Sequence, residues 1–70
     1  MTLLALILLS RASKDGVVRH NLAGTDRWIE VNTRSRARTH YIYGSGFYEV
    51  SYLTRRAAAN VIRISAQLEA

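Results

Sequence analysis

Two stretches in the first half of the chain alternate between apolar and polar positions, which is the pattern of a half-buried β-strand. The first covers residues 17–22 and the second covers residues 27–33, in which Ile29 and Val31 share one side. Between them, residues 23–26 read Ala-Gly-Thr-Asp, a composition typical of turns. The pattern predicts two antiparallel strands joined by a tight connection.

The following stretch, residues 34–52, predicts a β-hairpin. Gly44-Ser45 suits a two-residue type II′ turn, because the first turn position requires a positive φ. This turn would pair Tyr43 with Gly46 and separate the side chains onto an aromatic face and a basic face. The aromatic face comprises Tyr41, Tyr43, Tyr48, Val50 and Tyr52, and the basic face comprises Arg36, Arg38, His40, Glu49 and Ser51, with Ile42 and Phe47 near the turn.

An unbroken apolar run, Leu-Leu-Ala-Leu-Ile-Leu-Leu, occupies residues 3–9. Its leucine content favours a helix, whereas the Asp15-Gly16 pair that follows favours a hairpin, although Gly16 could also cap a helix. We predict a strand buried on both faces. The run is shorter than the roughly 20 residues that a membrane-spanning helix needs, and the absence of a basic segment before it does not favour a signal peptide.

The apolar spacing becomes helical after residue 53. Thr54 suits the N-cap position, and three consecutive alanines at residues 57–59 favour a helix. An apolar stripe with helical spacing predicts an amphipathic helix of about 13–15 residues. The stripe comprises Ala58, Val61, Ile62, Ser65 and Leu68, widened by Ala57 and Ile64.

Together these elements predict one α+β domain over residues 1–70, an antiparallel β-meander of four or five strands with one C-terminal amphipathic helix packed on one face. The helix is expected to cover Val18, Ile29, Val31, Tyr41 and Val50. The opposite face would carry Arg19, Trp28, Glu30, Arg36, Arg38, His40, Phe47 and Glu49.

Composition adds a strongly basic balance to this picture. The chain has ten basic and five acidic residues, a formal net charge of +5, and only one lysine among its basic residues. This charge favours an acidic partner such as nucleic acid, an acidic protein surface or anionic lipid. Codon usage in a GC-rich genome, which favours arginine, or simple solubility would explain it as well. The chain has no cysteine, which excludes disulfides and thiolate metal sites and is consistent with a cytoplasmic location.

The basic face of the predicted hairpin is the candidate binding site. Arginines at every second position would stand about 6.5–7 Å apart along a strand, similar to successive phosphates on one nucleic-acid strand, and aromatic rings could stack on bases. The candidate residues are Arg19, Arg34, Arg36, Arg38, His40, Arg55 and Arg56, with Trp28, Tyr43 and Phe47 for stacking. Alternatively, Glu30 with Arg38, and Glu49 with His40 or Arg36, would form a ladder of cross-strand ion pairs that needs no ligand.

The sequence carries no catalytic or metal-binding motif. Two histidines are too few for a zinc site, the Gly44–Gly46 segment lacks the lysine of a phosphate-binding loop, and no cofactor is expected. We therefore expect a small non-enzymatic binding protein acting on nucleic acid or a nucleic-acid-bearing complex through an arginine-rich sheet face. Two alternatives stay open. One is a protein-directed inhibitor or adaptor of phage or mobile-element type, comparable to anti-CRISPR proteins in size and style only. The other is a homo-oligomer that pairs through a strand at residues 3–9.

Overall fold

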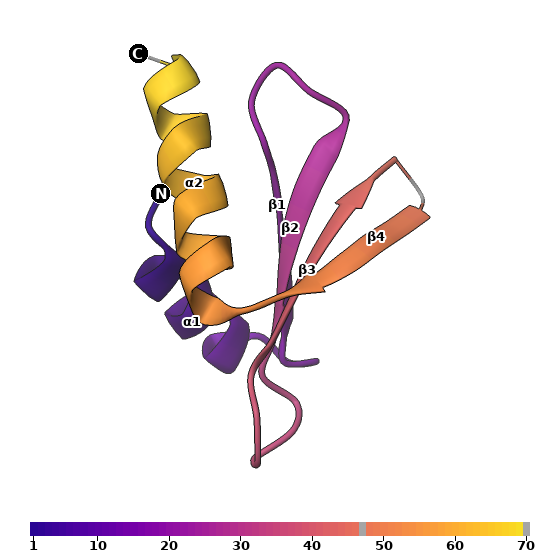
Figure 1. The fold of residues 1–70 in the computed structure, drawn as a ribbon. Coiled ribbons are helices and arrows are strands. Elements are labelled where there is room, and N and C mark those ends of the chain that lie inside the picture. Colours follow the sequence, from indigo (N-terminus) through magenta and orange to yellow (C-terminus); the bar gives the residue numbers. More distant parts are fainter. Residues whose placement is uncertain (47, 70) are drawn as a thin grey trace.

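The computed structural model describes residues 1–46 and 48–69, although not the side chains of residues 49, 68 and 69. Its four strands form one antiparallel sheet in chain order, and both helices cover the same face of that sheet (Figure 1). The α+β class with a C-terminal helix is confirmed. The elements are α1 (Leu3–Ala12), β1 (Val17–Asn21), β2 (Arg27–Asn32), β3 (His40–Ser45), β4 (Tyr48–Leu53) and α2 (Arg55–Glu69).

The prediction of a strand at residues 3–9 is wrong, because this segment is the helix α1. The Thr2 hydroxyl caps its first turn by accepting a hydrogen bond from the Ala5 amide at 3.1 Å. The buried side chains follow helical spacing and pack against β1 and β2. They are Leu3, Leu6, Ile7 and Ser10. The strand on which the expected homo-oligomer would pair is therefore not formed at residues 3–9.

Ser10 joins the end of α1 to the sheet. Its hydroxyl oxygen is fully buried and lies 2.8 Å from the carbonyl oxygen of Gly16, 3.0 Å from that of Val31, and 2.9 Å from the Thr33 hydroxyl. A serine hydroxyl has one hydrogen, which the carbonyl oxygens of Gly16 and Val31 share, while its oxygen can accept a hydrogen bond from the Thr33 hydroxyl. It fixes the end of α1 against the end of β2.

Replacing Ser10 with alanine should therefore destabilise the fold by about 1–2 kcal/mol, because the buried hydroxyl and its hydrogen bonds to the Val31 carbonyl and the Thr33 hydroxyl are lost, partly offset by alanine's better helix propensity. We expect the midpoint of thermal unfolding to fall by about 4–8 °C for each kcal/mol. Ser51→Ala, at an exposed position on β4, is the matched control and should leave the midpoint nearly unchanged. Equal midpoints for the two variants would contradict this role of Ser10.

The predicted strands at residues 17–22 and 27–33, and the turn between them, are confirmed. Ile29 and Val31 are fully buried in the core beneath the two helices. In α2, the Thr54 hydroxyl accepts a hydrogen bond from the Ala57 amide at 3.1 Å, as its N-cap position predicts. The expected stripe on α2 is buried at Ala58, Ile62 and Ser65 and partly buried at Ala57 and Val61, whereas Ile64 is exposed and the Leu68 side chain lies outside the described residues.

The predicted register of the β3–β4 hairpin is wrong. The strands pair Ser45 with Tyr48 and Tyr41 with Leu53, so the connection lies after Ser45 rather than at Gly44-Ser45. A β-bulge follows Tyr43. The expected aromatic face is consequently divided: Tyr41 is buried under the helices, whereas three members assigned to the same face are exposed. They are Tyr48, Val50 and Tyr52.

Trp28 explains why Gly44 lies inside a strand instead of a turn. These two residues are paired across β2 and β3, and the indole ring occupies the space where a side chain at position 44 would stand. A Cβ atom added to Gly44 would lie 2.1 Å from Cζ2 of Trp28. The indole N–H also donates a hydrogen bond to the Gly46 carbonyl oxygen at 2.7 Å. Trp28 therefore packs flat on the sheet and is only 5% exposed.

The sheet face that carries no helix, which we call the open face, holds Arg19, Trp28, Glu30 and His40, as the alternation predicted. The Arg19 guanidinium lies over the Trp28 ring, 3.8 Å from its centre, and forms an ion pair with Glu30 at 3.3 Å. The expected pairing of Glu30 with Arg38 is therefore wrong. The other expected pair involved Glu49, whose side chain lies outside the described residues.

Candidate nucleic-acid interface

Arg34, Arg36 and Arg38 lie in the connection between β2 and β3, not on a strand. The expectation that they form a row with strand spacing is wrong, because residues 34–39 offer no apolar side to bury and β2 instead pairs with β3 from Asn32 and His40 onward. The start of the connection is fixed: the Thr33 amide donates to the Gly16 carbonyl at 2.8 Å, and Arg34 Nε donates to the Asp15 carbonyl at 2.7 Å.

The register of the sheet brings this connection to the same end of the molecule as three other segments. Val17, Asn32 and His40 are paired side by side, and Leu53 is opposite Tyr41, so β1 and β3 begin and β2 and β4 end there. The end of α1 and the start of α2 lie at this end too, at the bottom of Figure 1. We call it the basic end because seven exposed cationic side chains occupy it: Arg11, Lys14, Arg34, Arg36, Arg38, Arg55 and Arg56.

Charge is thus divided unevenly over the molecule. The basic end has seven of the ten cationic residues and one carboxylate, Asp15, which gives a net charge of +6. The rest of the chain has three cations and four carboxylates, a net charge of −1, and the two parts sum to the +5 of the whole. A charge concentrated in this way produces a local field that attracts anions.

Two shallow hollows lined by polar atoms meet on the basic end. One, of about 360 Å³, lies between the turn after α1 and the start of the β2–β3 connection, and includes Lys14 and Arg34. The other, of about 240 Å³, lies along that connection and includes Arg36 and Arg38. Arg11 and Thr33 line both hollows. Cationic and hydroxyl side chains therefore border a continuous surface that an anionic chain could follow.

The guanidinium groups of the basic end form no ion pair among the described side chains, whose only ion pair is Arg19 with Glu30, and the charge of Arg34 is only the smallest of the causes that lower the pKa of Asp15. Asp15 is engaged locally instead. Its carboxylate accepts hydrogen bonds from the Ser13 hydroxyl at 2.6 Å and from the Val17 amide at 3.3 Å, and these bonds, the first above all, lower the pKa of Asp15 below its usual value of 3.8. The cations remain available to an external anion.

An aromatic pair borders the basic end on the open face. The rings of His40 and Tyr52 meet edge to face, with centres 6.1 Å apart. Tyr52 is 64% exposed. Tyr52 is the last residue but one of β4 and is paired with Ile42, near the start of β3. Its ring therefore lies close to the β2–β3 connection that carries the arginines.

The remaining candidate residues lie away from the basic end. Arg19 and Trp28 contact each other on the open face, and Trp28 is too buried for its ring to stack on a ligand. Tyr43 lies on the helix-covered face, where its hydroxyl accepts a hydrogen bond from Arg27 at 2.6 Å that raises the pKa of Arg27 above its usual value. Phe47 lies outside the described residues.

Sequence reasoning missed three residues of this surface: Arg11, Lys14 and Tyr52. Arg11 and Lys14 follow the apolar run that was interpreted as a strand, so their proximity to Arg34 was not apparent. The pairing of residues 17–22 with residues 27–33 could have predicted this proximity, because it brings the segment before Val17, with Arg11 and Lys14, next to the segment after Asn32. Tyr52 was assigned to the covered face by the wrong hairpin register.

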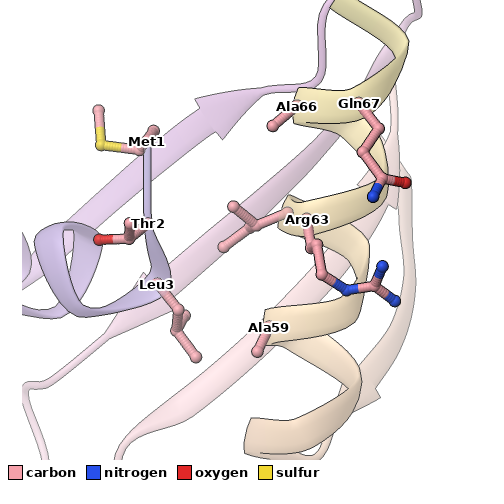
Figure 2. A pocket seen from close by; sticks show the side chains of 8 residues that line it. Met1, Thr2, Leu3, Ala59, Arg63, Ala66 and Gln67 are labelled. Carbon is pink, nitrogen blue, oxygen red and sulfur yellow. The ribbon is translucent and has the colours of Figure 1, made fainter.

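A second surface feature is apolar. A groove of about 530 Å³ lies between the start of α1 and the later turns of α2, and Figure 2 shows Leu3 directed toward Ala59 across it. In the same view, the polar ends of Arg63 and Gln67 lie on the side of α2 away from Met1. No polar groups converge in the groove. Beside it, four large apolar side chains are exposed, one before α1 and three on it: Met1, Leu4, Leu8 and Leu9.

Within residues 1–46 and 48–69, neither helix has the length and hydrophobicity needed to cross a membrane. The part of the chain that the structure describes also contains no group of three or more metal-ligating side chains close enough to hold an ion. Comparisons of the chain with protein-family models, with curated proteins and with solved structures found no match.

Proposed function

We propose that this protein is a small non-enzymatic binding protein whose target is nucleic acid or a nucleic-acid-bearing complex, and that it binds through the basic end. The observation that supports this proposal is the concentration of seven cations and a net charge of +6 on one end of a small domain. The proposed surface is thus an end of the molecule and not the sheet face that the sequence favoured. The absence of cysteine suits a reducing location such as the cytoplasm.

Arginine is well suited to this role. Its planar guanidinium donates paired hydrogen bonds to phosphate oxygens and stays charged at every physiological pH. Six of the seven cations of the basic end are arginines, and all seven side chains are exposed. The two hollows that meet at Arg11 and Thr33 would let successive phosphates contact different arginines.

The proposal is tested by measuring the affinity for labelled single-stranded and double-stranded oligonucleotides as a function of salt. Each phosphate neutralised contributes about 0.7 to the slope of log K against log salt for a single strand and about 0.9 for a duplex. Three to five contacts would therefore give a slope between about −2 and −4.5. An affinity that is undetectable at low salt, or equal at low and high salt, would exclude nucleic acid as the target.

A protein-directed inhibitor or adaptor is the second candidate, since an acidic protein surface would also complement the basic end. Capture of partners on the immobilised protein separates the two candidates. Partners that require nucleic acid are lost when the extract is treated with nuclease. A specific partner that survives this treatment, together with weak oligonucleotide binding, would favour the protein target.

Self-association has one observation in its favour, the four apolar side chains exposed by 49–59% each at Met1 and along α1. A second copy is a suitable partner for this surface, because pairing of two such surfaces buries apolar area, although Arg11 of each copy lies at the end of the same helix side. Light scattering over a wide concentration range tests this candidate. A constant monomer mass at high concentration would remove it.

A further inference from the structure

The exposed ring of Tyr52 adds an aromatic group to the cationic surface of the basic end. Its neighbour His40 contacts it edge to face, which holds the tyrosine ring in place while 64% of the residue stays exposed. Trp28, which is larger, cannot take this role because it is covered by Arg19 and hydrogen-bonded to Gly46. Tyr52 is therefore the accessible, supported ring on the described part of the open face nearest to the arginines.

The Tyr52 ring lies near the segment that carries the arginines. Arg38 precedes His40 by two residues, so their Cα atoms are at most about 7 Å apart, and the His40 ring contacts Tyr52. A strand whose phosphates contact the basic end could therefore also bring one of its bases to Tyr52. The other exposed tyrosine of β4, Tyr48, is paired with Ser45 at the opposite end of the strand.

The presence of a ring beside the cations distinguishes single strands from duplexes. In a duplex both faces of each base are covered by neighbouring bases, so a protein ring has no base face to contact unless the duplex opens. In a single strand the faces are available, and stacking tolerates any sequence because every base has such a face. Cations alone would bind both forms.

We propose that the protein binds unpaired nucleic acid, with phosphates along the basic end and one base stacked on Tyr52. This inference depends on the proposed function and adds to it the class of nucleic acid and the residue that selects it. Arg36 and Arg38 hold the backbone, His40 orients the ring, and Tyr52 contacts the base.

The test compares Tyr52→Leu with Tyr48→Leu, which removes a still more exposed ring from the same strand at the far end. Binding is measured by fluorescence anisotropy with a single strand of about 12 nucleotides, within the site sizes of small single-strand-binding domains, and with the duplex of the same sequence. We expect Tyr52→Leu to weaken single-strand binding by roughly 5- to 100-fold. Tyr48→Leu, and Tyr52→Phe, which keeps the ring, should bind as the original protein does.

The outcomes separate this inference from the proposed function. The inference is overturned if the original protein binds the duplex at least as tightly as the single strand, or if Tyr52→Leu and Tyr48→Leu bind alike. The proposed function is still supported in either case, provided that binding depends on salt. If neither oligonucleotide binds at low salt, the proposed function fails, and the inference fails with it. Thermal unfolding of each variant establishes that the compared proteins are folded.

Discussion

Replacing Gly44 with alanine is expected to destabilise the fold by about 3 kcal/mol, at the upper end of the range for overpacking substitutions. The added Cβ would lie 2.1 Å from a carbon of the Trp28 ring, so the ring or the strand must move. Movement of the ring would break its hydrogen bond to Gly46 and its contact with Arg19. For a domain of this size this is a large part of a total stability of about 3.5–10 kcal/mol.

Thermal unfolding and tryptophan fluorescence measure this effect together, because Trp28 is the only tryptophan in the chain. Gly24→Ala is the control: Gly24 has a positive φ of 71° but nothing within 4 Å of its added Cβ, so this variant introduces backbone strain of about 1–2 kcal/mol without a clash. Its folded-state fluorescence should not change. In a Trp28→Leu background, Gly44→Ala should become much less destabilising, since the ring it meets is gone. An equally large effect in both backgrounds would contradict the proposed packing.

Charge reversal of Arg36 and Arg38 together should produce the largest loss of binding. Two exposed ion pairs with phosphate, at about 0.2–1 kcal/mol each, would be replaced by repulsions of similar size. The sum of about 1–4 kcal/mol corresponds to roughly 5- to 1,000-fold weaker binding. The slope of log K against log salt should become shallower by about 1.4 on a single strand, since two phosphate contacts are lost.

A matched comparison separates a local contact from the overall charge. Arg38→Glu and Arg63→Glu each lower the net charge from +5 to +3, and both residues are exposed, but Arg63 lies on α2 beyond the basic end. We expect Arg38→Glu to weaken binding clearly more than Arg63→Glu does. Equal effects would mean that only the net charge matters and that the β2–β3 connection is an ordinary solvated loop.

The parts of the fold that the sequence predicted are those in which one side of an element is apolar. Residues 17–22 and 27–33 and the helix after Thr54 each show a clear period, because each buries one face and exposes the other. The run at residues 3–9 has no such contrast, since α1 is apolar on its outward side as well. The N-cap residue Thr2 and the leucine-rich composition were the available signals for a helix.

The hairpin register could not be predicted from local turn preferences. Gly44 looks like a turn residue, but its position is determined by Trp28, sixteen residues earlier, whose ring needs a cross-strand neighbour without a side chain. This long-range requirement moves the turn past Ser45 and changes which tyrosines are exposed. The alternation of residues 34–40 was misleading for a different reason. The residues between the arginines are small or polar, so a strand here would have no apolar face to bury.

Five of the candidate arginines nevertheless lie at one end of the molecule, although the structural reason differs from the one the sequence suggested. They are Arg34, Arg36, Arg38, Arg55 and Arg56. The order of an antiparallel meander explains this, since its alternate connections lie at the same end of the sheet. Arg11 and Lys14 join them through the packing of α1, which the strand interpretation could not foresee.

The central claim, that the basic end is the binding surface, is tested most directly by following the backbone amide resonances of the protein while a single-stranded oligonucleotide is added. A domain of 7.9 kDa is well suited to this measurement. We predict that the largest shifts occur around Arg11, in residues 34–40, at Tyr52 and at the start of α2. Shifts confined to the outward side of α1 or to the connection between β1 and β2, with residues 34–40 unaffected, would contradict it.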